Sequence, residues 1–448
     1  MTQSQINPTA EPTVVPRADH GISRSDISEN ALKVLYRLRK AGYAAFIVGG
    51  GVRDLLLGLH PKDFDVVTDA LPDEVRSLFR NSRLIGRRFR LAHVRFGREI
   101  IEVATFRAGG QANGEDSDSD REHDVASGRI LRDNVYGGID EDIWRRDFTA
   151  NALYYNIADF SVWDYTGGME DIAARTLRLI GDPETRYRED PVRMLRAIRF
   201  AAKLDFSVHE SAAEPIPRLA PLLRDVPSAR LFEEVLKLFQ AGHAMRSFEL
   251  LDEFGLLEYL FPTTADRLRD RDGAAVREFI TRGLTSTDER VAQEKPITPM
   301  FLYAVMLWPA IRVAAERFDA HDELPRAGAL AEACYQIMTT QQACTALPKR
   351  YSVPMREILQ LQHRFANRKG ARAERFLSHK RFRAAYDFMT LRASCGEEDE
   401  EVAQWWTDVQ SRPAAEVKQA FGGGQRRKSG RRGGRRRRSR ARTGDSQS

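Results

Sequence analysis

Two aspartates, Asp63 and Asp65, lie two residues apart in the stretch KDFDVVT, directly before the apolar pair Val66 and Val67. Because side chains alternate along a strand, residues two apart point to the same face. Two carboxylates on one face repel each other unless a cation lies between them. The spacing predicts a divalent-metal pair on a strand, and a turn with solvated acids is the alternative for such a pair taken alone.

A glycine turn precedes these aspartates. The apolar residues 44–48 predict a buried strand, and the three glycines 49–51 then let the chain turn where a side chain would clash. Residues 52–57 have helical spacing, and Gly58 is placed to end that helix. The local order is therefore strand, glycine turn, short helix and second strand.

The glycine turn has the properties of an anion site. Backbone N–H groups at a helix N-terminus attract phosphate, and Arg53 adds a positive fork. No Gly-Lys-Ser/Thr follows the glycines, which excludes a Walker-type P-loop. A calcium loop is disfavoured because its fifth position would be Val67, which has no side-chain oxygen. A phosphate cradle beside a metal pair is the equipment of nucleotidyl transfer.

The run FIVGGGVRDLLLG followed by KDFDVVTDA resembles the class II nucleotidyltransferases of the polymerase-β superfamily, which include bacterial poly(A) polymerases and CCA-adding enzymes. The resemblance implies an α/β nucleotidyltransferase head followed by all-α neck, body and tail domains, with disordered termini. It implies that Asp63 and Asp65 are catalytic and hold two Mg²⁺ ions. It also implies that Gly49, Gly50 and Arg53 cradle the triphosphate of ATP.

Glu102 lies in the apolar strand expected over 98–107. A lone carboxylate in a buried strand is costly unless it is paired or metal-bound, so we expect Glu102 to be the third metal ligand. A salt bridge to a nearby arginine is the alternative, and the resemblance favours the metal. The stretch GRRFRLAHV (86–94) is similar to the poly(A) polymerase branch of the family rather than the CCA-adding branch.

The motif RRDFTANALYY (145–155) is expected to form a helix with Asp147, Asn151 and Tyr154 roughly on one face. Its match to the family's RRDFT-x-N motif implies that Asp147 and Asn151 hold the ribose of the nucleotide. The same match implies a catalytic role for Asp147. N-terminal charges on a capped helix are the structural alternative.

The motif EDPVRMLRAIRF (189–200) predicts a long helix that begins at Asp190 and Pro191. Asp190, Arg193 and Arg196 are then expected on one helical face. The resemblance implies that this is the family's neck motif, whose side chains pair with the incoming base. A solvated arginine face is the alternative.

The 448 residues suffice for two or three domains. We expect a disordered lead-in over 1–22, the head over 23–157 and the neck over 158–215. A helical RNA-binding body over 216–400 and a flexible, basic, Arg/Gly-rich tail over 401–448 complete the chain. Within this frame, Ser28 is placed to cap a helix that ends before Gly42, and the acidic stretch 109–128 predicts a mobile loop.

The net charge of +6 is unevenly distributed. From Phe421 to Ser448 the chain has eleven Lys and Arg residues against Asp445, a net charge of +10. The other 420 residues therefore carry −4, the difference between +6 and +10. Such a tail attracts the phosphate backbone of RNA without sequence preference.

Together these features predict an enzyme that transfers AMP from ATP to the 3′-hydroxyl of single-stranded RNA without a template, releasing pyrophosphate by a two-metal mechanism. A CCA-adding tRNA nucleotidyltransferase is the nearest alternative, and an RNA-binding protein with a retired catalytic site is another. No apolar run approaches the roughly 20 residues of a membrane span, and Cys334, Cys344 and Cys395 suit free thiols in a reducing cytoplasm. Association with the RNA-degradation machinery is left open by the sequence.

Overall fold

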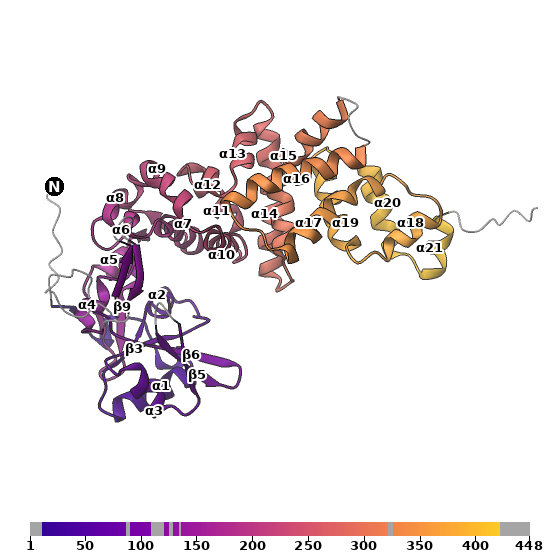
Figure 1. Ribbon diagram of the computed structural model, residues 1–448. Helices are drawn as coiled ribbons and strands as arrows, with labels where there is room; N and C mark the ends of the chain where they lie inside the picture. The colour runs from indigo at the N-terminus through magenta and orange to yellow at the C-terminus, as the bar shows by residue number, and fades with distance from the viewer. Residues whose placement is uncertain are drawn as a thin grey trace, which may run out of the picture. The chain divides into compact units, whose positions relative to one another are not determined.

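The computed structural model describes residues 11–86, 90–108, 121–124, 129–133, 136–320 and 326–421. The chain divides into two compact units, Met1–Arg356 and Glu357–Ser448, and each is described by itself (Figure 1). Most of the expected loop 109–128 lies outside the described residues, but β7 (Arg121–Asp124) pairs with β8 (Arg129–Asp133). None of the described helices is both long and apolar enough to cross a bilayer.

The head is built on one eight-stranded sheet in which only the β3–β6 pair is parallel. A mixed sheet of this kind can leave part of one face open to solvent. In spatial order its strands are β1 (Thr13–Val15), β10 (Val162–Asp164), β9 (Leu153–Asn156), β2 (Ala45–Val48), β3 (Asp65–Thr68), β6 (Glu99–Thr105), β5 (Leu91–Phe96) and β4 (Ser82–Ile85).

One face of the sheet is covered by α1 (Glu29–Lys40) and α3 (Pro72–Leu78). The expected cap at Ser28 is confirmed, because its hydroxyl accepts hydrogen bonds from the N–H groups of Asn30 (3.2 Å) and Ala31 (3.4 Å). The apolar stripe of α1 is fully buried. The opposite face of the sheet is apolar at β9 and β2, where Val48 and Tyr154 are buried, and carries charged groups at β3, β6 and β5.

The strand, glycine turn and short helix expected around the glycines are confirmed as β2, Gly49 and α2 (Gly50–Leu56). Gly49 has φ +73°, a left-handed conformation that a side chain would strain. A Cβ at Gly51 would touch Ile47 and Phe64 at 3.5 Å, so α2 starts close against the sheet.

The helix expected over 145–155 is wrong. The segment forms a single 3₁₀ turn, η3 (Thr149–Asn151), and then enters the sheet as β9. Leu153, Tyr154 and Tyr155 are fully buried because β9 lies between β2 and β10. Aromatic residues suit a pleated, packed surface, and this burial overrides the helical spacing.

The disordered lead-in expected over 1–22 is also wrong for its described part. β1 pairs with β10 and so protects the edge of the sheet. His20 is buried, with its ring bonded to the carbonyl oxygen of Phe160 (2.8 Å) and to the N–H of Ile22 (3.2 Å). Residues 13–22 therefore belong to the head, and β10 extends the head's sheet beyond residue 157.

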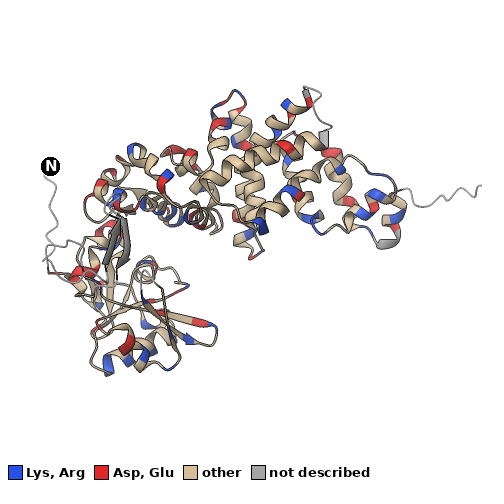
Figure 2. Cartoon of the chain, viewed as in Figure 1, with Lys and Arg blue, Asp and Glu red and all other residues tan. Residues whose placement is uncertain are grey.

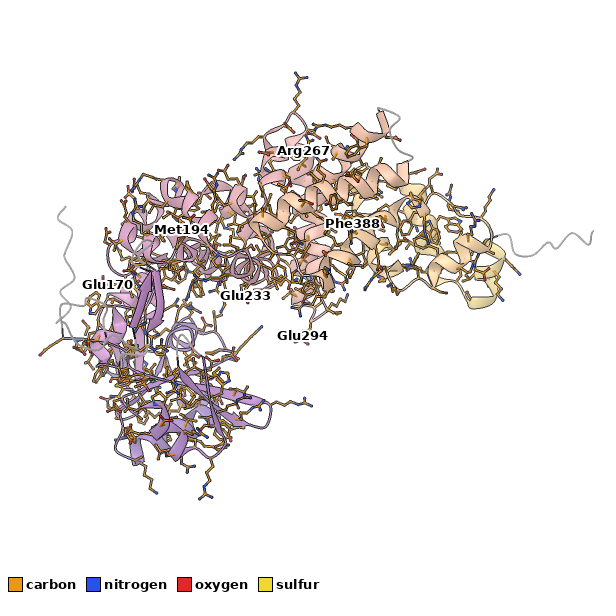
Figure 3. The ribbon with its side chains drawn as sticks, in the orientation of Figure 1. Glu170, Met194, Glu233, Arg267, Glu294 and Phe388 are labelled. Atoms are coloured by element: carbon orange, nitrogen blue, oxygen red, sulfur yellow. The ribbon has the colours of Figure 1, made fainter. Side chains whose placement is uncertain are left out.

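After the sheet, unit 1 is mainly helical, apart from β11 (Thr176–Leu177), which pairs with β12 (Ser207–Val208). Met194 of α7, labelled in Figure 3, is fully buried. The further helices of this unit are α4 (Ile139–Ile143), α5 (Gly168–Ala173), α6 (Pro183–Glu189), α7 (Val192–Leu204), α8 (Glu210–Ala213), α9 (Ile216–Leu219), α10 (Ser228–Phe239), α11 (Ala244–Glu253), α12 (Leu257–Leu260), α13 (Pro262–Arg269), α14 (Gly273–Ala292), α15 (Pro299–Ala320) and α16 (Arg326–Cys344), with α17 (Lys349–Gln360) reaching the second unit.

The second unit is a small helical domain with an aromatic core. It contains α18 (Gly370–Leu377), α19 (Phe382–Ser394), α20 (Glu400–Ser411) and α21 (Ala414–Ala420). Trp406 is fully buried and its indole N–H donates to the carbonyl oxygen of Phe365 (2.8 Å). The prediction of a flexible tail from residue 401 is therefore wrong for residues 401–421, because α20 and α21 complete this core. The chain beyond Phe421 lies outside the described residues.

Asp164 joins the end of β10 to the start of α5. Its carboxylate accepts hydrogen bonds from the four consecutive N–H groups of residues 166–169, at 2.8 to 3.0 Å. This junction supports the η3 turn, because Gly168 packs against the carbonyl of Thr149 so closely that no Cβ would fit.

We expect Asp164→Ala to destabilise the head by about 2–3 kcal/mol, since several buried N–H groups lose their acceptor. Urea unfolding followed by tryptophan fluorescence measures the loss. Glu170, an exposed acid of α5 labelled in Figure 3, provides the control, and Glu170→Ala should stay within about 0.5 kcal/mol of wild type. Equal losses in the two variants would contradict this role for Asp164.

Candidate active site

Three titratable side chains form a row across the open face of the sheet. The register places Asp65 of β3 opposite Glu102 of β6, and Glu102 opposite His93 of β5. Residues opposite each other share a face, so the two carboxylates are neighbours. Asp63 precedes β3 and is exposed.

Glu102 is not buried, although the sequence predicted that it would be. Its side chain is 52% exposed, because Ile101 and Val103 take the buried face of β6. It also has a partner, since its Oε1 lies 3.1 Å from Nε2 of His93. The register with Asp65, rather than burial, is what now supports Glu102 as a third metal ligand.

The register places the carboxylates of Asp65 and Glu102 side by side. Asp65 is an exposed residue, yet the surrounding chain desolvates its carboxylate and raises its pKa to about 6. The charges of Glu102 and Asp63 raise this pKa further, while Arg146 opposes them. Among the described residues, no three acid, histidine or cysteine side chains already surround one point as an ion would require. The uncompensated negative charge nevertheless suits a divalent cation, which would lower this pKa.

Arg146 is a site residue that the sequence reasoning missed. Its Nε donates to the hydroxyl of Tyr154 and its Nη2 to Asp142, both at 2.8 Å. A Cβ on Gly49 would lie 3.8 Å from its Nη1, so the guanidinium stands beside the glycine turn. The doubled arginine of RRDFT was the available signal. Arg146 is thus a fixed cation between the glycine turn and Asp65.

Arg53 and Asn151 are brought together, but Arg53 is not a free cation. It is almost fully buried, and its Nη1 donates to Oδ1 of Asn151. Its Nε donates to Asp54 (2.8 Å), and its guanidinium lies 5.4 Å from the ring centre of Phe200. In this structure Arg53 therefore positions Asn151 beneath the turn of Gly49 and Gly50.

Asp147 is buried between two arginines of α7. Arg193 Nε lies 2.9 Å from one of its oxygens and Arg196 Nη2 lies 2.8 Å from the other. Burial alone would raise the pKa of Asp147, but Arg196 and Arg193 outweigh it and hold the pKa below its ordinary value. Both oxygens of the proposed ribose ligand are thus already bonded.

The expected helical face of Asp190, Arg193 and Arg196 is only partly formed. Asp190 lies at the junction of two helices, because it ends α6 and its side chain accepts from the N–H of Val192, the first residue of α7 (3.3 Å). The other carboxylate oxygen pairs with Arg230 of α10 at 2.6 Å. The two arginines instead converge on Asp147. Arg196 is 38% exposed and Arg193 only 9%, so Arg196 is the one accessible to a ligand.

The raised pKa of Asp65 gives a test in the metal-free protein. Between its ordinary pKa near 4 and the folded value of about 6, the unfolded chain is ionised while the folded state still holds the proton. The carboxylate therefore destabilises the fold increasingly as pH rises through this range, and fully above it. Asp65→Asn should raise Tm by about 2 °C at pH 8, after allowance for solvent screening, and by almost nothing at pH 4.

Thermal unfolding in a chelating buffer measures both values. With excess Mg²⁺ the wild type should regain the difference at pH 8, because the ion replaces the missing positive charge. A Tm difference that is the same at both pH values would contradict the assignment.

Three protein-family models match the chain. They are "Poly A polymerase head domain" over 45–178, "Probable RNA and SrmB- binding site of polymerase A" over 205–268 and "Polymerase A arginine-rich C-terminus" over 322–443. The first model spans β2 to β11, the second begins just before β12 and ends within α13, and the third begins before α16 and extends into the second unit.

Relatives that align over most of the chain include proteins named poly(A) polymerase I. "Poly(A) polymerase I" of Salmonella typhi is 52% identical over 408 residues, which cover 91% of this chain and 87% of that protein. A "CCA-adding enzyme" of Lactobacillus helveticus is 36% identical over 233 residues, 52% of this chain.

The solved structure "tRNA-processing enzyme (apo form I)" shares the fold, with a TM-score of 0.59 and 21% identity over 87% of this chain and 93% of that one. The likeness to the tRNA enzymes thus extends over the fold, while the strong sequence identity is with the polymerases. More than half of the aligned residues are identical to poly(A) polymerase I, and the alignment covers 91% of this chain. The chain therefore belongs to the bacterial poly(A) polymerase family.

Proposed function

We propose that this chain adds AMP units from ATP to RNA 3′ ends without a template and releases pyrophosphate. The observation that carries the proposal is the 52% identity to poly(A) polymerase I over 91% of this chain, with the carboxylates of β3 and β6 in the matched head. We propose that it acts in the cytoplasm, because its relatives are bacterial poly(A) polymerases.

Asp63, Asp65 and Glu102 are the residues proposed to hold magnesium. When bound, two such ions activate the 3′-hydroxyl and stabilise the departing pyrophosphate. The unsatisfied negative charge around Asp65 supports this assignment. His93 of β5 lies within hydrogen-bond distance of Glu102 (3.1 Å) and so restricts the orientation of its carboxylate.

The glycine turn and Arg146 are proposed to bind the triphosphate. The start of α2 offers backbone N–H groups, and Arg146 adds a cation held by Asp142 and Tyr154. Arg53 supports this turn from below rather than contacting phosphate. Because these groups are fixed before ATP binds, little ordering is needed on binding.

Asn151, Asp190, Arg193 and Arg196 are proposed to recognise the nucleoside, with Asp147 as the group that orients the two arginines. Asp147 fixes Arg196 by one oxygen and leaves that guanidinium partly exposed. A fixed guanidinium and a carboxylate can pair with a base edge directionally. Asp190 is oriented by Arg230 in the same way.

The direct experiment incubates purified protein and Mg²⁺ with a generic RNA and each nucleoside triphosphate separately. Long products with ATP alone support the proposal. The CCA-adding alternative rests on the match over half of the chain, and it requires a short product that needs both CTP and ATP. That outcome would overturn the proposal.

Removal of either aspartate should abolish activity. We expect Asp63→Ala and Asp65→Ala to lower the rate of AMP transfer by at least a thousandfold, since each removes a ligand of the ions that carry the chemistry. RNA affinity, measured separately by fluorescence anisotropy, should remain near wild type. Asp159→Ala, an exposed acid in the turn between β9 and β10, serves as the control. Activity within about tenfold of wild type in either site variant would contradict the metal assignment.

Arg196→Ala should raise KM for ATP by about tenfold and relax discrimination against other nucleotides, because it removes one directional partner of the base. Arg188→Ala, which removes an exposed arginine of α6, is the matched control. Steady-state kinetics with ATP and GTP measure both effects. A fall in rate with unchanged nucleotide selectivity would assign Arg196 to structure alone.

A further inference from the structure

The second unit has a concentrated basic surface at α18 and the turn before it. Five cationic residues lie within twelve positions, and we call them the α18 basic patch: Arg364, Arg368, Lys369, Arg372 and Arg375. Arg368 is partly exposed and the other four are exposed. Glu374 is the one acidic residue between positions 358 and 386. In Figure 2 this stretch is found at the place labelled α18 in Figure 1.

The cations of the patch have no carboxylate partners among the described residues, although neighbouring cations do. Lys380 and Arg381 both pair with Glu357, and Arg383 pairs with Asp387. Within the patch, only non-acidic contacts occur. Arg364 lies 5.8 Å from the ring centre of Phe376, and Arg375 donates to the carbonyl oxygen of Ala371. The positive charges of the patch are therefore not neutralised by carboxylates of the described residues, although Arg364 and Arg375 make other contacts.

This arrangement is unfavourable for the protein alone. Lys369 occupies the N-cap of α18, and the first turn contains Arg372 and no acid. The positive end of the helix dipole repels cations, and like charges close together repel one another. Folding tolerates this repulsion, and an anion bound across the patch would relieve it.

Acidic residues of the second unit gather elsewhere. α20 is capped by Asp399 and begins with the exposed Glu400 and Glu401, which suit the helix dipole. Charge of opposite sign is therefore segregated between the starts of α18 and α20. The basic stretch is complementary to a polyanion rather than to a mixed protein surface.

The patch also adjoins the point where the basic C-terminal sequence departs. The N–H of Gly370 donates to the carbonyl oxygen of Phe421 (2.8 Å), and Phe421 is buried. The sequence beyond Phe421 has eleven further Lys and Arg residues. The last described residue of the chain is thus anchored beside Lys369 of the patch.

We propose that the α18 basic patch binds the phosphate backbone of single-stranded RNA without sequence preference, in a unit separate from the catalytic head. Guanidinium groups match phosphate oxygens in a bidentate manner, and such contacts carry no base information. The proposal relies on the proposed function only for the choice of RNA as the polyanion.

The test uses the full chain with all five residues changed to glutamine, R364Q/R368Q/K369Q/R372Q/R375Q. Affinity for fluorescent 20-mers of oligo(A) and of mixed sequence is measured by anisotropy over a range of salt concentrations, without ATP. If about three phosphates are contacted, the log–log salt slope should flatten by about 2 units, and affinity at 0.15 M salt should fall about 50-fold for both RNAs.

A control variant removes the same charge from the head. Lys33, Arg39, Lys40, Arg76 and Arg80 are exposed on or just after α1 and α3, and K33Q/R39Q/K40Q/R76Q/R80Q should leave the salt slope unchanged. The Tm of the patch variant should equal or exceed that of wild type, because repulsion is removed. The patch effect should persist in a chain that ends at Phe421, which separates it from the basic tail.

An unchanged salt slope in the patch variant, or a loss confined to one RNA sequence, would overturn the proposal. So would equal losses in the patch and control variants, which would indicate a general charge effect. Turnover on a saturating short RNA should stay near wild type. Because binding is measured without ATP, failure of the patch and failure of AMP transfer give different results.

Discussion

Asp147 is buried where the head meets α7, with Arg193 on one oxygen and Arg196 on the other. A buried carboxylate is tolerated only when its charge and lone pairs are matched, and removal of one partner leaves the other charge unpaired. The two arginines therefore fix α7 against the η3 turn. The same junction is completed by Arg53, which bonds Asn151 of η3 and lies over Phe200 of α7. The proposed nucleoside site thus depends on ion pairs that cross from sheet to helix.

Asp65 on β3, in contrast, is not matched by positive charge in this way. Asp65 lies beside Glu102, and its pKa remains raised although the charge of Arg146 lowers it. The chain satisfies Asp147 completely and leaves Asp65 short of positive charge. The protein matches the charge of Asp147 with two arginines, whereas the excess negative charge around Asp65 suits the metal proposed for it.

The sequence correctly predicted those elements whose formation depends on residues close together in the chain. Gly49 requires its positive φ and Ser28 caps α1, so β2, α2 and α1 were correctly expected. The errors arose where long-range pairing decides. Residues 153–156 have helical spacing, yet the central position of β9 between β2 and β10 makes them a strand. Residues 13–15 look like part of a polar lead-in, but a free sheet edge orders them.

Register also explains which parts of the candidate site the sequence could reach. Asp63 and Asp65 were found because their spacing is local, and Glu102 was chosen on a burial argument that the alternation of β6 reverses. Arg146 was missed because its contact with Tyr154 and its position beside Gly49 depend on the pairing of β9 with β2. The net charge of the chain is misleading for a similar reason, because a sum does not show where the charges lie. A net −4 for the first 420 residues conceals five cations at α18 that have no carboxylate partner among the described residues, because acids of other helices cancel them in the sum but not in space. Over a Debye length of about 8 Å in physiological salt, an RNA strand responds to the local arrangement and not to the total.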